Sequence, residues 1–120
     1  MSATETISVL ERTATTYTFR GDVSTGSYQE AIKDEITDFL KGVIVKGENL
    51  PQVQRSLSYA KEHGRIPDVD VTTTVKRRTH TVEVRLGSDV PINPEHQVDV
   101  AEGLQKIMSR YELQPKAQYN

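Results

Sequence analysis

The chain has 120 residues, a length that fits one domain, and a formal net charge of −2. This charge does not imply attraction of the whole chain to nucleic acid or acidic membranes, so any such binding needs a local patch. The absence of cysteine excludes disulfides, thiol nucleophiles and zinc sites of the cysteine type. No apolar run reaches the roughly 18 residues that cross a bilayer, and no basic and apolar leader is recognised, so we expect a cytoplasmic protein without a membrane partner.

Residues 5–21 form the first predicted element, a β region. Thr, Tyr, Phe, Val and Ile, which favour a pleated and half-buried surface, are common in it. Tyr17 and Phe19 alternate with polar neighbours, but the pattern breaks near residues 12–15. The segment is therefore either a hairpin or one long bent strand.

The first predicted helix begins at Ser27. Ser27 and Glu30 have the spacing of a capping box, in which each side chain accepts a hydrogen bond from the backbone N–H of the other residue. An apolar stripe at helical spacing follows, made of Ile32, Ile36, Phe39, Leu40 and Val43. Either Gly42 or Gly47 ends the helix, because glycine adopts the left-handed conformation of a C-terminal cap at little cost.

A second helix and a hairpin are predicted in the middle of the chain. Pro51 suits a first helical turn and Gly64 suits a C-terminal cap, so we expect a helix from Pro51 to His63. From residue 69 to 86, valines alternate with threonines and charged residues, as in two half-buried strands. The tip, Lys76-Arg77-Arg78-Thr79, lacks glycine, which disfavours a two-residue turn and favours a longer loop built on a type I turn.

The third predicted helix has Asn93 as its N-cap and Pro94 in its first position. Its expected buried face consists of Val98, Ala101, Leu104, Ile107, Met108 and Tyr111. Pro115 lies just beyond the end of this helix, and residues 115–120 form a polar tail. We therefore predict one domain over residues 1–114.

Together these elements predict an α+β fold in which one antiparallel sheet of about four strands, arranged as two hairpins, carries three helices on one face. The two ends of the chain resemble each other, since each has a Thr-rich β region, a Gly/Asp/Val connector and a capped amphipathic helix. This echo is either a repeat of two ββα halves or convergence between connectors that commonly hold these residues. The uncovered face of the sheet is expected to carry Thr16, Thr18, Thr72, Thr74, Thr81, Glu83 and Arg85.

The basic hairpin tip is the first candidate binding surface. A two-stranded ribbon with a cationic tip can enter a nucleic-acid groove or hold phosphates. The residues concerned are Lys76, Arg77 and Arg78, with His80 beside them and Arg85 further along the open face. The alternative is a solvated hairpin end whose charges discourage edge-to-edge aggregation.

An acidic stripe on the first helix is the second candidate, as a face for a basic partner. Its residues, Glu30, Asp34 and Asp38, recur every four positions. Like charges at this spacing repel slightly, and a solvated helix face is the simpler explanation, because most charge runs are solvated. A residual hypothesis, a small hydrolase or metal-dependent enzyme, combines this stripe with His96.

No catalytic, cofactor or metal motif is recognised in the sequence. The three histidines lack the close spacing of metal ligands, and the glycines do not form a phosphate-binding loop. A nucleophile elbow is also missing. We therefore predict no catalytic residues, no metal ligands and no cofactor.

The leading functional hypothesis is a non-enzymatic binding or assembly protein that acts as a small homo-oligomer, with itself or another protein as partner. Small subunits commonly form closed symmetric oligomers, and a Thr-rich open sheet face offers a surface for one. The alternative hypothesis is a nucleic-acid-binding protein that uses the basic tip, residues 76–80.

Overall fold

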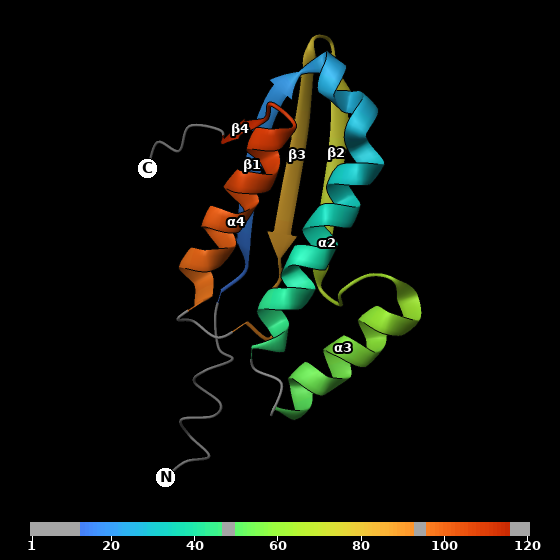
Figure 1. Cartoon of the computed structure of the whole chain (residues 1–120), viewed down its shortest axis with the longest axis vertical. Coiled ribbons are helices and arrows are strands. Elements are labelled where there is room, and N and C mark those ends of the chain that lie inside the picture. The colour runs from blue at the N-terminus through green and yellow to red at the C-terminus, as the bar shows by residue number, and fades with distance from the viewer. Residues whose placement is uncertain (1–12, 47–49, 93–95, 116–120) are drawn as a thin grey trace.

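One antiparallel sheet with helices on one of its faces makes up the structure, a computed structural model that describes residues 13–46, 50–92 and 96–115 (Figure 1). The sheet has the strand order β2-β3-β1-β4. Its strands are β1 (Thr15–Asp22), β2 (Val69–Lys76), β3 (Thr79–Leu86) and β4 (Gln114–Pro115). The helices are the 3₁₀ helix η1 (Val23–Tyr28) and the α-helices α2 (Gln29–Val45), α3 (Pro51–His63) and α4 (Gln97–Arg110). The predicted α+β fold, with one four-stranded antiparallel sheet and three α-helices, is confirmed.

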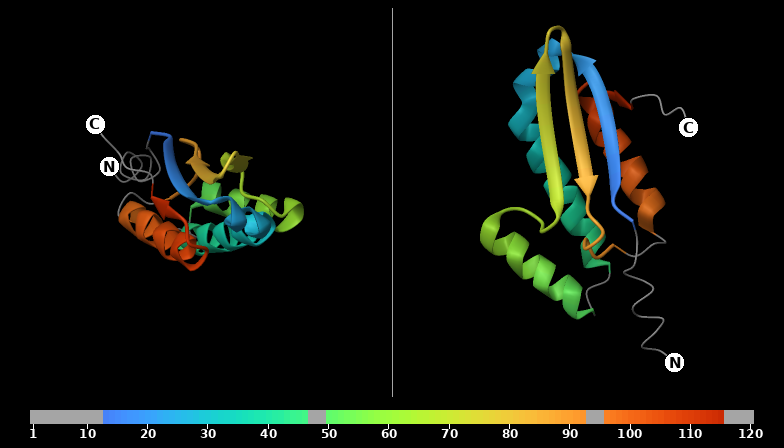
Figure 2. Two further views of the ribbon diagram at one scale, coloured as in Figure 1. Left: turned by 90° about the horizontal axis from the view of Figure 1, so that it is seen from above. Right: turned by 180° about the vertical axis from the view of Figure 1, so that it is seen from behind.

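The echo between the two ends of the chain falls on equivalent elements. β1 and β3 lie side by side at the centre of the sheet, antiparallel, and each is followed by a helix, α2 or α4, on the same face (Figure 2). In each half the next strand comes after the helix, as in the split β-α-β arrangement. Within the described residues the halves are therefore β-α-β units and not the expected ββα units. β1 is a single strand from Thr15, and residues 5–12 of the expected β region lie outside the described residues.

The start of the first helix differs from the predicted capping box. The Asp22 carboxylate accepts a hydrogen bond from the backbone N–H of Ser24 at 3.0 Å and caps η1. The Ser27 hydroxyl donates to the Ser24 carbonyl at 3.1 Å, and α2 begins at Gln29 without a side-chain cap. The prediction was wrong because a 3₁₀ turn brings the chain into helical conformation before Ser27, so that Ser27 already lies inside the turn.

The C-terminal part of α2 continues through Gly42 to Val45. Val43 and Ile44 are buried, so packing holds the helix beyond the glycine that we expected as one possible end. Phe39 is only half-buried, and its ring lies against Gly103 of α4. The close approach of these two helices depends on the missing side chain at Gly103.

The helix α3 and the hairpin β2–β3 have the expected positions, but the hairpin tip does not have the expected loop. α3 has the predicted bounds and ends on Gly64, whose φ is 72°. At the tip, Lys76 pairs with Thr79, which leaves a two-residue loop of Arg77 and Arg78. Arg77 has a φ of 59°, so an arginine supplies the left-handed conformation that glycine usually gives to such turns.

The core lies between the sheet and the helices α2 and α4. From α4 it takes Val100, Leu104, Ile107 and Met108. Val98, which we predicted to be buried, is 66 % exposed, because it lies about 120° around the helix from Leu104. The expected N-cap residues of this helix, Asn93 and Pro94, lie outside the described residues.

β4 extends the sheet across the expected boundary at residue 115. Gln114 pairs with Arg20, and Pro115 pairs with Phe19. Proline lacks a backbone donor and is therefore found mainly on edge strands, where β4 lies. Among the helices of the described residues, not one combines the length and the apolar character that crossing a bilayer needs.

Candidate functional site

No described helix covers the face of the sheet opposite α2 and α4 (Figure 2), and the side chains that the strand register places on this face are polar. Strand alternation places the odd-numbered residues of β3 on this face, and the strand register brings even-numbered residues of β1 and β2 beside them. The predicted open-face residues, Thr16, Thr18, Thr72, Thr74, Thr81, Glu83 and Arg85, are all exposed or half-exposed. No described helix packs on them, so these side chains are free to contact other molecules.

A shallow depression of about 400 Å³ lies on this face near the hairpin tip. Arg20, Lys76, Arg77, Thr79 and Thr81 line it. Arg20 comes from β1, and it reaches the tip because it pairs with Thr81 across the β1–β3 ladder. Sequence reasoning missed Arg20, although its alternation with Thr16 and Thr18 already placed it on the open face.

The cations around this depression differ from Arg85 in their surroundings. Among the described residues, no carboxylate forms an ion pair with Arg20, Lys76 or Arg77. Arg85, at the other end of the face, lies 3.5 Å from Asp68 and 3.8 Å from Asp70. On the open face, the cations without a described ion pair therefore lie at the hairpin tip.

Asp22 is the acidic residue closest to this end in the strand register, where it pairs with Thr79. Its carboxylate accepts from the backbone N–H of Ser24, and this hydrogen bond lowers the pKa of Asp22. The carboxylate is therefore charged at neutral pH, but it is engaged by η1 and is not among the groups that line the depression.

The prediction that His80 lies beside the cations of the tip is wrong. As an even-numbered residue of β3 it faces the helices, and it is 0 % exposed. The Thr25 hydroxyl donates to the Asp22 carbonyl and therefore accepts from Nδ1–H of His80, at 2.7 Å. Nε2 of His80 has no hydrogen-bond partner in the described part of the chain, and burial lowers the pKa of this imidazole. We therefore exclude His80 from the candidate surface.

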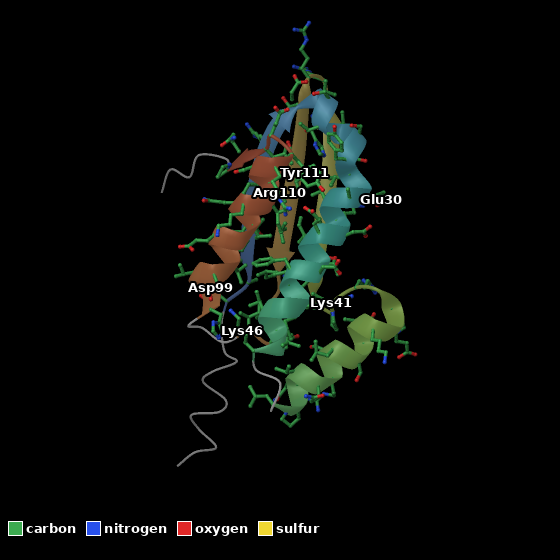
Figure 3. The ribbon with its side chains drawn as sticks, in the orientation of Figure 1. Glu30, Lys41, Lys46, Asp99, Arg110 and Tyr111 are labelled. Atoms are coloured by element: carbon green, nitrogen blue, oxygen red, sulfur yellow. The ribbon has the colours of Figure 1, made fainter. Side chains whose placement is uncertain are left out.

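The acidic stripe on α2 is exposed along its length, with Glu30 on the side of α2 away from α4 (Figure 3). Glu30 and Asp34 line a separate groove together with Lys33 and Arg65, so cations lie among these carboxylates. Asp38 does not line this groove. The stripe therefore presents mixed charge and not a purely acidic face.

The described residues do not form the metal site that the hypothesis of a metal-dependent enzyme requires. Within the described ranges no group of three His, Asp or Glu side chains could hold a metal ion. Nδ1 of His96 lies 3.2 Å from Asp99, and Asp99 also pairs with Lys46 at 3.6 Å. His96 is thus engaged at the start of α4, while the acidic stripe belongs to α2.

Two polar contacts link α2 to α4 on the helix side of the sheet (Figure 3). Arg110 donates to Glu35 at 3.2 Å near one end, and Lys46 lies 3.6 Å from Asp99 near the other. Burial, followed by the nearby charge of Glu35, raises the pKa of Tyr111, so this hydroxyl stays protonated. These contacts are solvent-exposed, lie on the helix layer and take no part in the open face.

The arrangement at the tip can hold phosphate oxygens. Arg guanidinium groups form paired hydrogen bonds to phosphate, and threonine hydroxyls add further donors.

Comparison with known proteins gives no family for the chain: no protein-family model, curated protein or solved structure matches it.

Proposed function

We propose that this protein binds the phosphate backbone of duplex nucleic acid at the basic end of its open sheet face. The observation that carries the proposal is the convergence of Arg20 from β1 with Lys76 and Arg77 from the hairpin, without acidic partners among the described residues. Unpaired cations beside hydroxyl donors match the chemistry of a phosphodiester backbone. A two-stranded ribbon also has the width that the major groove of DNA admits.

The open face favours contact with phosphates over contact with bases. Sheet-based RNA-recognition modules stack bases on aromatic residues of their open face. Here the corresponding positions on β1 and β3 include Thr16, Thr18, Thr79 and Thr81, which cannot stack on bases. Binding is therefore expected to depend little on sequence and strongly on salt. With Arg78 as a fourth contact, the logarithm of the affinity should fall against the logarithm of salt with a slope of about −3 to −4.

Fluorescence anisotropy of a labelled duplex of mixed sequence, between 50 and 200 mM salt, tests this proposal. The double variant Arg20→Gln with Arg77→Gln keeps both side-chain stems and removes two charges. It should bind more weakly at every salt concentration and reduce the slope by about 2. Arg55→Gln removes an exposed arginine from α3 and is the matched control, which should bind like the wild type.

Two results would contradict the proposal. One is wild-type protein that shows no salt-sensitive binding to the duplex. The other is a double variant that binds as well as Arg55→Gln, which would place the duplex elsewhere on the surface. Equal competition by an acidic protein and by unlabelled duplex would instead indicate a general polyanion surface, and nucleic acid would not be the preferred partner.

Self-association is a second candidate function, as expected for a binding or assembly protein. One specific observation favours it: within the described residues, the outer side of β2 pairs with no other strand. Light scattering at micromolar concentration measures the mass directly, and a strictly monomeric species would contradict this second function.

A further inference from the structure

The outer edge of β2 has an unusual composition for an exposed edge. Natural edge strands are commonly short, charged or interrupted by proline. β2 has eight residues, and between Asp70 and Lys76 it carries five uncharged β-branched residues in a row, Val71, Thr72, Thr73, Thr74 and Val75. Such residues favour strand pairing, so this edge can accept another strand.

The hydrogen-bond pattern identifies which backbone groups of β2 face outward. The N–H of Gly87 donates to the carbonyl of Asp68 at 2.8 Å, one step beyond the Val69–Leu86 pair. Inward and outward groups alternate along an antiparallel strand, so the even-numbered residues of β2 bond to β3. The odd-numbered residues, with Thr73 at their centre, therefore direct N–H and C=O outward.

The side chains on the helix side of this edge are incompletely covered. Val75 is 46 % exposed and Val71 is half-buried, whereas Val82 and Val84 on neighbouring β3 are fully buried. The helices therefore leave an apolar strip along β2. A strand added to this edge with valines at matching positions would cover the strip.

One register satisfies the backbone, the charges and the apolar strip together. If two β2 strands pair antiparallel about a two-fold axis at Thr73, odd-numbered residues bond to odd-numbered residues. Asp70 then lies opposite Lys76 of the second copy, and Val71 lies opposite Val75 of the second copy, each pair occurring twice by symmetry. No other register places Asp70 opposite Lys76.

We propose that β2 pairs in this register with β2 of a second copy of the chain, which joins two four-stranded sheets into one continuous sheet. Parallel pairing would set Asp70 beside Asp70 and Lys76 beside Lys76, and this repulsion disfavours the parallel arrangement. A two-fold contact closes on itself, so the result is a dimer. The opposite edge of the sheet differs, because β4 covers part of β1 there.

A charge swap gives the sharpest test, with the dissociation constant of the dimer measured by analytical ultracentrifugation without nucleic acid. Asp70→Lys and Lys76→Asp should each weaken the dimer about tenfold, because each places two like-charge pairs at the interface. The double variant should restore wild-type affinity. Asp70 and Lys76 lie at opposite ends of one strand and cannot contact within one copy, so rescue reports contact between copies. Glu83→Lys reverses a charge on the same face of β3 and should leave the dimer unchanged.

The backbone pattern has its own test. Thr73→Pro removes an outward N–H, so it should abolish the dimer while the β2–β3 ladder remains intact. Thr72→Pro removes an inward N–H and should destabilise the monomer itself. In hydrogen exchange, the amide protons of Val71, Thr73 and Val75 should be protected at high protein concentration and exposed at low concentration.

Several results would overturn the proposal. These are a strictly monomeric chain at 100 μM, a dimer that is insensitive to Thr73→Pro, or a double charge variant that stays as weak as its parents. A monomer whose β2 amides become protected only by a peptide from another protein would also overturn the choice of a second copy. The proposal rests on the second candidate function, self-association, and shares Lys76 with the proposed nucleic-acid surface. The two can still fail separately, because the dimer is measured without nucleic acid and because Arg20→Gln with Arg77→Gln leaves the Asp70–Lys76 contact in place.

Discussion

Along β3, residues that face the helices alternate with residues that face solvent, and the two sets differ in how deeply their side chains are buried. His80, Val82, Val84 and Leu86 are at most 2 % exposed. The set between them is polar, with Thr79, Thr81, Glu83 and Arg85 exposed or half-exposed. Packing against helices restricts the first set, whereas the second set has no described neighbour above it. One strand thus stabilises the fold on one side and offers a surface for recognition on the other.

The largest difference in the free energy of unfolding is expected between alanine variants of two neighbours on β3, Leu86 and Arg85. Leu86→Ala should lower the free energy of unfolding by about 2–5 kcal/mol, because it leaves a cavity under the helices. Arg85→Ala should change it by less than about 1 kcal/mol, because its ion pairs with Asp68 and Asp70 are solvent-exposed. Urea denaturation of both variants measures this. Comparable losses would show that the open face is also packed.

The same alternation explains which features could be predicted from sequence. The open face was predictable because period-two patterning needs no knowledge of distant contacts, and α3 was predictable because Pro51 and Gly64 mark both of its ends. Arg20 was missed as part of the tip, because its position there depends on pairing between β1 and β3, which lie far apart in the sequence. His80 was misplaced because it follows three cations in the sequence, whereas the alternation of β3 directs its side chain toward the helices.

Predictions from short sequence patterns were wrong where the backbone can adopt more than one local conformation. Ser27 and Glu30 have the spacing of a capping box, yet Asp22 caps an earlier 3₁₀ turn and makes that box unnecessary. The absence of glycine at the tip led us to expect a longer loop, but it does not prevent a two-residue turn, because Arg77 adopts the left-handed conformation. Both errors arise from local preferences of about 1 kcal/mol, which tertiary packing easily exceeds.

The covered side of the sheet can be tested further at the contact between α2 and α4. A Cβ on Gly103 would meet the ring of Phe39, so Gly103→Ala should destabilise the protein by about 1–3 kcal/mol. In a Phe39→Ala background the ring is absent, and the same substitution should stabilise it by up to about 1 kcal/mol, because alanine favours helix over glycine. A double-mutant cycle in urea measures this reversal of sign. Equal effects in both backgrounds would show that the two residues do not touch.

His80 allows a test of the covered face through pH. Its pKa is lowered by burial in the folded state, so the unfolded chain binds a proton on this residue more readily than the folded chain does. The stabilising contribution is therefore fully present above the unfolded pKa of about 6.5 and is lost progressively as pH falls from that value to the lower pKa of the folded state. The melting temperature of the wild type should fall between pH 7 and pH 5 more steeply than that of His80→Gln. His63→Gln, in which an exposed histidine of α3 is replaced, is the matched control and should follow the wild type.

The smallest expected change in stability is that of Arg77→Gly, and it is a gain in stability where Leu86→Ala and Gly103→Ala are losses. Its φ of 59° costs a residue with a side chain about 1 kcal/mol relative to glycine. Arg77→Gly should therefore raise the free energy of unfolding by about 0.5–1 kcal/mol, although the greater freedom of glycine in the unfolded chain offsets part of this gain.

The same substitution removes one of the unpaired cations at the tip, so duplex binding should weaken while stability rises. Arg78→Gly is the matched control for stability alone. Arg78 is not among the described residues with positive φ, so glycine should not raise the free energy of unfolding there. A destabilised Arg77→Gly would contradict the two-residue turn. A stabilised variant with unchanged duplex binding would remove Arg77 from the nucleic-acid surface and leave the turn as described. Stability and binding that move in opposite directions would show that the tip retains a strained arginine at a position where charge is used and packing is not.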